Sequence, residues 1–136
     1  MERIELNEFE IELDGQVEVF FLNSEKYNGL IYELFNGSVV SEFEVVDGFK
    51  NGYEKIFSEN GIIESEAMYK KGLLDGLTKN YYATGKLHEE AFFEFGICLW
   101  HKLYDENGYM KEKFNIDKKS SDYKLLEIFR KNETGR

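Results

Sequence analysis

Two histidines, His88 and His101, and one cysteine, Cys98, are the side chains best suited to act as a base or a nucleophile near neutral pH. Nucleophilic catalysis needs a nucleophile held beside a base and, for cysteine, a lowered thiol pKa. Cys98 lies in the apolar stretch Ile-Cys-Leu, and nothing basic marks it as activated. We therefore predict no catalytic residue in this chain and interpret all three side chains as structural.

The acidic turn Asp-Glu-Asn-Gly at residues 105–108 resembles part of a calcium-binding loop. It lacks the spaced oxygen ligands and the terminal glutamate of such loops, and Ser-Glu-Asn-Gly occupies the equivalent place at residues 58–61. A hairpin turn explains both segments. The glycines fall at hairpin intervals and form no phosphate-binding loop. We predict no metal, no cofactor and no enzymatic activity.

The composition limits the class of partner. The 136 residues include 27 acids and 17 bases, giving a formal net charge of −10, whereas nucleic acids and anionic membranes are bound by basic surfaces. An acidic protein is suited to meet a basic protein surface. A lone cysteine, an acidic and alternating N-terminus, and the absence of a long apolar run indicate a soluble, cytoplasmic protein.

Glycines recur at three sets of positions with one common period. The steps between the turn glycines are 24, 24 and 23 residues, and a period of 20–50 residues is typical of a repeat architecture. The sets are Gly37, Gly61, Gly85 and Gly108; Gly48, Gly72 and Gly96; and Gly29, Gly52 and Gly76, with Trp100 in the fourth slot. The chain is therefore predicted to consist of copies of one hairpin unit.

Each copy is predicted to contain two short strands around its turn, for example residues 53–57 and 62–69. A three-residue loop with a left-handed glycine would pair Phe57 with Ile63 and Tyr53 with Ala67. The same rule pairs Tyr81 with Leu87, Tyr104 with Met110, Leu77 with Ala91, and Trp100 with Phe114. All of these side chains are predicted to share one apolar face. On it a lysine recurs between the two layers at 55, 79 and 102, opposite Ser65, Glu89 and Glu112.

The two ends of the chain depart from the repeat. Asp14-Gly15 is a strong hairpin signal, and the strand VEVFFL follows it, so residues 1–28 are predicted to be N-terminal capping strands. Residues 29–119 hold the repeats, and residues 120–132 form a C-terminal helix. The whole chain, residues 1–136, is predicted to be one domain: an elongated all-β meander of stacked antiparallel hairpins with a short capping helix.

The predicted helix has clear end signals. Ser120 or Ser121 can cap its N-terminus, and Arg130-Lys131 suit its last turn. Leu125, Ile128 and Phe129 are predicted to lie on its buried side, with Leu126 at the margin. We expect the helix to cover the open edge of the last hairpin, because an uncovered edge invites association.

Acidic residues form a column on the second, wetter face of the predicted sheet. Glu42, Glu66 and Glu90 occupy the same repeat position, with Glu44 and Glu64 beside them. Ile56, Met68 and Phe92 are predicted to share this face and could anchor a partner. The column has two interpretations that the sequence leaves open: it keeps the protein soluble, or it binds a basic partner and speeds association.

The repeat resembles a known family. Gly52-Tyr53, Phe57, Asn60-Gly61, Tyr69, Lys71-Gly72 and Asp75-Gly76 are similar to the MORN-repeat variant, and the resemblance covers roughly residues 29–115. The fourth copy departs from the pattern where Trp100 replaces the leading glycine. Bacterial chains of this kind resemble antitoxin or immunity proteins, the YwqK type among them, and other MORN-bearing proteins serve as scaffolds or membrane-associated adaptors.

The resemblance implies a function in binding. The leading hypothesis is a monomeric immunity protein or antitoxin that neutralises a cognate bacterial toxin by direct contact. The toxin is expected to have a basic surface, as a nuclease would. The alternative is a MORN-type scaffold or adaptor that holds several proteins.

Overall fold

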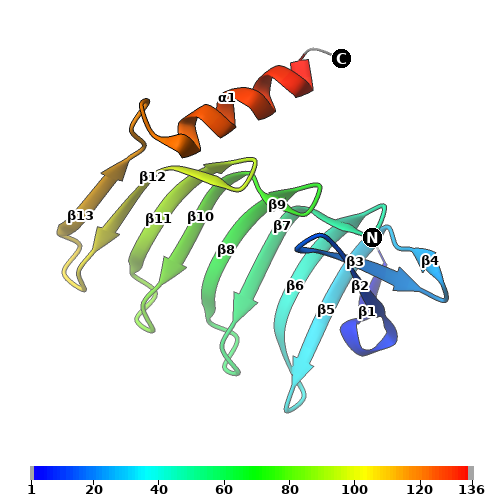
Figure 1. The fold of residues 1–136 in the computed structure, drawn as a ribbon. Helices are drawn as coiled ribbons and strands as arrows, with labels where there is room; N and C mark the ends of the chain where they lie inside the picture. Colours follow the sequence, from blue (N-terminus) through cyan, green and yellow to red (C-terminus); the bar gives the residue numbers. More distant parts are fainter. Residues whose placement is uncertain (1, 135–136) are drawn as a thin grey trace.

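The computed structural model describes residues 2–134 and is dominated by one long, curved sheet (Figure 1). Its main strands pair antiparallel in chain order, which confirms the predicted meander of hairpins. They are β5 (Gly29–Phe35), β6 (Ser38–Val46), β7 (Phe49–Phe57), β8 (Ile63–Lys70), β10 (Gly76–Tyr81), β11 (Leu87–Glu94), β12 (Ile97–Tyr104) and β13 (Met110–Asn115). The short β9 (Leu73–Leu74) pairs with β8, and β1 (Arg3–Glu5) lies parallel to β5 at the first edge.

A second, smaller sheet lies across the N-terminal part of the main sheet. After a 3-10 turn, η1 (Leu6–Glu8), it contains β2 (Glu10–Asp14), β3 (Val17–Leu22) and β4 (Glu25–Lys26). The Asp14-Gly15 hairpin is confirmed, with Asp14 opposite Val17. Phe20 of β3 is 2% exposed and packs with Ile31, Phe43 and Val45 of the main sheet in the central core cluster. The N-terminal segment thus folds over one face of the main sheet.

The predicted cross-strand pairing is correct for the residue pair nearest each turn and wrong for the next predicted pair. Phe57 lies opposite Ile63, as predicted, but a β-bulge between Ile56 and Phe57 shifts the pairing, and Tyr53 lies opposite Met68 instead of Ala67. A bulge sets two residues of one strand against one of its partner, so alternation is offset beyond it. The same correction applies to Leu77, which faces Phe92, and to Trp100, which faces Asn115.

These bulges divide the predicted apolar side chains between two faces. Phe43, Val45 and Ala91 are buried on the face that the small sheet covers, which we call the core face. Tyr81 lies on the opposite face, where its hydroxyl reaches Glu66 of β8. We call this second face the ladder face. The prediction of a single apolar face is therefore wrong, because each bulge moves the rung beside the turn onto the ladder face.

The glycines opposite the hairpin turns are required by close packing. Gly72 has φ +85°, and a Cβ added there would lie 2.2 Å from Cγ1 of Val17 in β3. Gly48, with φ +82°, approaches Val19 of the same strand in the same way. Gly61 has nearly the same φ, +82°, but nothing lies within 4 Å of an added Cβ. The small sheet therefore depends on glycine at two repeat positions that lie one period apart.

A recurring side-chain hydrogen bond joins each copy to the next. Residues 47, 71 and 95 all have positive φ, and each donates its backbone N–H to an Asn or Asp side chain that precedes a repeat glycine. The pairs are Asp47 to Asn28 at 2.9 Å, Lys71 to Asn51 at 3.0 Å, and Phe95 to Asp75 at 3.3 Å. This bond satisfies a turn donor and fixes the spacing of neighbouring hairpins.

The C-terminal helix α1 (Ser121–Thr134) begins where the sequence predicts. Ser120 caps it, because its Oγ accepts the N–H of Tyr123 at 3.1 Å. Its packing differs from the prediction: Leu126 is fully buried, whereas Leu125 and Ile128 are 43% and 54% exposed. The helix docks through the side that carries Leu126. This residue, predicted at the margin of the buried side, therefore lies at the centre of the contact between the helix and the sheet.

The helix lies at the end of the sheet opposite the hairpin turns at Gly61, Gly85 and Gly108, not along the edge of β13 (Figure 1). Arg130 makes a bidentate ion pair with Glu94, and the ring of Phe129 packs on Phe95 with centroids 5.5 Å apart. These contacts hold the helix at the β11–β12 turn. All six residues of β13 are exposed, so the prediction that the helix covers this edge is wrong.

The two glycines of similar φ allow the packing of the small sheet to be measured. We expect Gly61→Ala to cost about 1 kcal/mol of unfolding free energy from backbone strain, and Gly72→Ala about 2–4 kcal/mol, because Val17 must also move. Urea unfolding of both variants checks this. Adding Val17→Ala to Gly72→Ala should recover part of the loss, whereas equal losses in the two glycine variants would contradict the packing argument.

Candidate functional site: a protein interaction face

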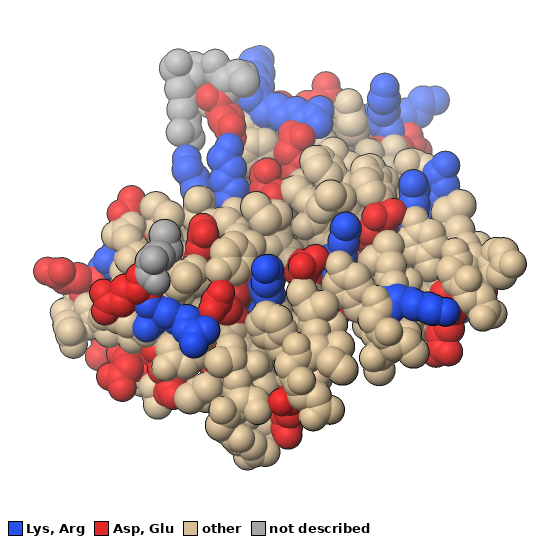
Figure 2. Space-filling view, turned by 180° about the vertical axis from the view of Figure 1, so that it is seen from behind, with Lys and Arg blue, Asp and Glu red and all other residues tan. Residues whose placement is uncertain are grey.

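A row of alternating charges crosses the ladder face from strand to strand. Each member lies opposite the next in the sheet register, so the row runs perpendicular to the strands. In order, it contains Glu42, Lys55, Glu66, Lys79, Glu90 and Lys102, followed by Lys113 on β13. We call it the charge ladder. Figure 2 shows it as alternating red and blue side chains across an otherwise largely tan face.

Each glutamate of the ladder accepts a hydrogen bond from a tyrosine hydroxyl. Tyr53 donates to Glu42 at 2.8 Å, Tyr81 to Glu66 at 2.9 Å, and Tyr104 to Glu90 at 2.8 Å. At the N-terminal end, Arg3 also forms an ion pair with Glu42 at 2.9 Å. Hydrogen bonds to a carboxylate are stronger than neutral ones, so these side chains are held in place before any partner arrives.

The pKa values of these groups follow from their contacts. Burial acts to raise the pKa of Glu42, but the hydrogen bonds from Arg3 and Tyr53 outweigh it, so this pKa is lowered. Burial and the bond to Glu42 raise the pKa of Tyr53 to about 12. The bond to Glu90, followed by burial, raises that of Tyr104. Glu42 is therefore ionised, and Tyr53 and Tyr104 are neutral, around pH 7.

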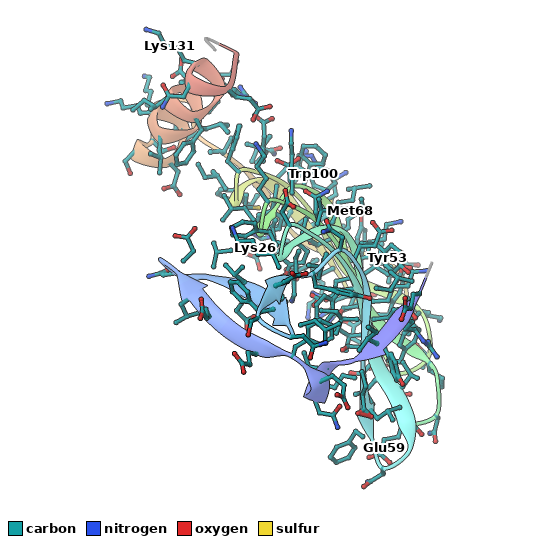
Figure 3. All side chains as sticks on the ribbon, turned by 90° about the vertical axis from the view of Figure 1, so that its right-hand side faces the viewer. Lys26, Tyr53, Glu59, Met68, Trp100 and Lys131 are labelled. Atoms are coloured by element: carbon teal, nitrogen blue, oxygen red, sulfur yellow. The ribbon has the colours of Figure 1, made fainter. Side chains whose placement is uncertain are left out.

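Apolar and aromatic side chains flank the charge ladder on both sides. Met68 and Leu77 are 42% and 43% exposed, and the rings of Phe92 and Trp100 stack with centroids 6.3 Å apart. In Figure 3, Tyr53, Met68 and Trp100 lie on the side of the main sheet away from the small sheet. The second flank holds Phe57, Tyr81 and Tyr104, one from each hairpin.

The hollows of this face are open and shallow. One of ≈ 440 Å³ lies among Arg3, Val39 and Phe57, and another of ≈ 290 Å³ lies between Tyr53 and Leu77. Small-molecule sites bury most of their ligand in a concave, mainly apolar pocket. A broad face with apolar flanks and a polar row fits the surface of another protein better.

Most of the predicted site residues lie together on the ladder face. Besides the three ladder glutamates, Met68 and Phe92 lie opposite Tyr53 and Leu77 there. Glu44 reaches over Gly52, and Glu64 sits at the bulge of β8. Ile56 is the exception, because it alternates with Lys55 and pairs with Ser41 and Ser65 on the core face. Its predicted place beside Met68 is wrong.

Sequence reasoning missed the partners of the acidic column. The register predicted Lys55 opposite Ser65, whereas the bulge sets it opposite Glu66. The signal was present, since a lysine recurs with the same period as the glutamate. The three tyrosine hydroxyls were not predicted as partners either. The column is therefore one half of a ladder of mixed charge, with three glutamates and four lysines.

The acidic excess of the chain lies in its first half. Residues 1–28 and residues 29–68 each carry eight acids and two bases, whereas residues 69–136 carry 11 acids and 13 bases. The excess is therefore shared equally between the N-terminal strands and the first hairpins of the main sheet. A basic partner is attracted to this half of the molecule more than to the C-terminal half.

The histidines and the cysteine lie apart from the ladder. His88 stacks on Tyr82 with ring centroids 4.3 Å apart, and His101 stacks on Phe114 at 5.1 Å. Burial raises the pKa of Cys98, whose Sγ donates to the carbonyl oxygen of Trp100. Across residues 2–134, no set of three or more His, Cys, Asp or Glu side chains is grouped so as to hold a metal ion.

Comparison with protein families supports the repeat assignment. Residues 50–71 and 74–94 match the family described as the MORN repeat variant. The two matches cover consecutive hairpins, β7–β8 and β10–β11, and they support the MORN resemblance together with a repeat-containing binding or scaffold protein. A comparison with curated proteins gave no match.

Solved structures with partial similarity are much larger proteins. A mutant of TarM from S. aureus aligns with a TM-score of 0.45 and 8% identity over 82% of this chain and 20% of TarM. The structure of accessory secretory protein 1, 2 and 3 from Streptococcus pneumoniae aligns with a TM-score of 0.39 and 15% identity. The alignment covers 77% of this chain and 19% of that chain. The chain spans about a fifth of either protein.

Neither helix within residues 2–134 has the length and apolar composition of a membrane span.

Two tyrosines, Tyr53 on the ladder face and Tyr69 on the core face, provide a pH test of their contacts. The pKa of Tyr53 and that of Tyr69, which is buried near Glu54, are both raised to about 12 from 10.0. The folded protein keeps protons that the unfolded chain loses, so this contribution to stability is complete below pH 10 and disappears as the pH rises from 10 to 12.

Ultraviolet absorbance of tyrosinate during an alkaline titration checks this expectation. Tyr53→Phe and Tyr69→Phe should each remove part of the late-titrating signal. Tyr109→Phe, at a side chain that is 73% exposed, should leave that late signal in place. A late signal unchanged in both of the first two variants would show that these hydroxyls are not held as described.

Proposed function

We propose that this protein is a non-catalytic binding protein that acts as an immunity protein or antitoxin and neutralises a cognate bacterial toxin by direct contact. The observation that carries this proposal is the ladder face. It is broad, pre-ordered and flanked by half-buried aromatic and exposed aliphatic side chains, and no element within residues 2–134 covers it. Such a face can exclude water from a protein contact without any catalytic group.

The organisation of this face suits an inhibitor. Met68, Leu77 and the stacked Phe92–Trp100 pair offer apolar anchors close to the centre of the sheet. The charge ladder beside them supplies charges of both signs, which select a partner by their order more than by net attraction. Because the tyrosines already fix the glutamates, little side-chain entropy is lost on binding.

The remaining features of the proposal concern the partner and its location. The toxin is proposed to have a basic surface, as a nuclease does, because residues 1–68 carry 16 acids and only four bases. The protein is proposed to work as a cytoplasmic monomer. The second candidate is a scaffold that holds several proteins, and the match to the MORN repeat variant is compatible with this role.

Capture followed by a growth assay tests the immunity role. The protein is immobilised, the bound protein from its native host is identified, and that protein is expressed in bacteria with and without this chain. We expect growth arrest that this chain relieves. Several bound proteins, none of them toxic, would contradict the immunity role and support the scaffold.

Two exposed residues of adjacent strands test which face binds. Met68 lies on the ladder face and Ile56 on the core face, and they are 42% and 38% exposed. We expect Met68→Lys to weaken toxin binding at least about 30-fold, or about 2 kcal/mol, as for a contact at the centre of an interface. Ile56→Lys should bind normally in calorimetry. The reverse result would assign binding to the core face.

A further inference from the structure

The outer edge of β2 is a free strand edge. β2 lies at the end of the small sheet and pairs with β3 on one side, and within residues 2–134 no strand pairs with its other side. All five of its residues are exposed. An unpaired edge presents a row of backbone donors and acceptors that can accept another strand.

The hairpin register shows which backbone groups face outward. Asp14 and Val17 flank a two-residue turn and form the hydrogen-bonded pair that closes it. Because such pairs alternate along an antiparallel ladder, Ile11 and Leu13 occupy the non-bonded positions. Their N–H and C=O groups therefore point away from β3, toward the free edge.

The side chains of β2 have two distinct chemistries. Glu10, Glu12 and Asp14 alternate with Ile11 and Leu13, so carboxylates line one side of the strand and aliphatic groups the other. Leu13 is 71% exposed and Ile11 is 45% exposed. Exposed aliphatic side chains on an edge strand are unusual, because natural edges are blunted by lysine, proline or a cover.

Nearby bases offset the charge around this edge only in part, since Lys26 and Lys71 line a hollow with Asp14 at one end of β2. Residues 1–28 carry eight acids but only two bases, Arg3 and Lys26. Arg3 is engaged with Glu42 of the ladder, and Lys26 lies over the ring of Phe49 with its Nζ 5.8 Å from the centroid. A second copy of β2 placed on this edge would set carboxylates against carboxylates, which is unfavourable.

We propose that the outer edge of β2 docks an extended segment of a partner protein in which basic and apolar residues alternate. The backbone of the segment pairs with Ile11 and Leu13 and extends the small sheet by one strand. Its basic side chains meet Glu10, Glu12 and Asp14, while its apolar side chains cover Ile11 and Leu13. This is recognition by strand addition, in which the main chain supplies affinity and alternate side chains supply specificity.

This surface is separate from the ladder face. The small sheet and the ladder lie on opposite sides of the main sheet (Figure 3). The inference therefore does not depend on the immunity role, and it can be tested with purified protein and no toxin. A toxin that contacts only the ladder face would leave it unaffected.

Amide hydrogen exchange measured by NMR on the full chain tests the proposal. The probe is an end-blocked peptide of alternating lysine and valine. We expect it to slow exchange of the Ile11 and Leu13 amides by about tenfold or more, because both become hydrogen-bonded. Glu12→Lys should weaken the peptide's binding by about tenfold or more through the local reversal of charge.

Controls separate this site from general attraction. Glu59→Lys makes the same change at an exposed residue at the far tip of the β7–β8 hairpin (Figure 3) and should leave binding nearly unchanged. Unfolding curves establish that both variants are folded. A peptide of the same composition with its lysines in one block should not protect the two amides.

Four results would overturn the proposal. The first is unchanged exchange at Ile11 and Leu13, and the second is equal protection of these amides by the control peptide with its lysines in one block. The third is that Glu59→Lys weakens binding as much as Glu12→Lys. The fourth is protection that rises with protein concentration in the absence of peptide. The last would assign the edge to a second copy of this chain.

Discussion

The β-bulge beside each turn is the constraint on which the rest of the structure depends. It shifts the pairing of the two strands by one residue. Because strand side chains alternate between faces, every residue beyond the bulge gains a different cross-strand neighbour. In β7 and β8 the shift sets Lys55 beside Glu66 in place of Ser65. Repeated along the sheet, it builds the charge ladder and leaves small side chains such as Ala91 on the core face.

The hairpins are stable as a stack more than as separate units. Few side chains are fully buried, and the central cluster holds only Phe20, Ile31, Phe43 and Val45. Neighbouring copies are joined by strand pairing and by the recurring bond from a turn N–H to an Asn or Asp side chain. In such arrays stability comes from contacts between adjacent repeats. The ends are completed by different means, a small sheet at one and a helix at the other (Figure 1).

Charge is distributed so that the two sides of the molecule offer different chemistry. On the ladder face each glutamate is balanced by a lysine and held by a tyrosine, so binding there depends on shape and on the order of charges. The N-terminal strands carry unbalanced acids beside exposed Ile11 and Leu13. One small repeat protein thus presents an aromatic surface of mixed charge and an acidic, open strand edge.

The sequence by itself determined the period, the hairpins, the rung nearest each turn and the N-cap of the helix, because glycine turns and capping residues act locally. Only the tertiary structure decided which side chains share a face. The bulges, which no local signal placed, moved Ile56 away from Met68 and gave the glutamate column its lysines. It likewise decided that Leu126 is the centre of the helix contact, since the docking side depends on Glu94 and Phe95, more than 30 residues earlier in the chain. These contacts depend on residues that are distant in sequence, and the periodicity of the sequence alone does not predict them.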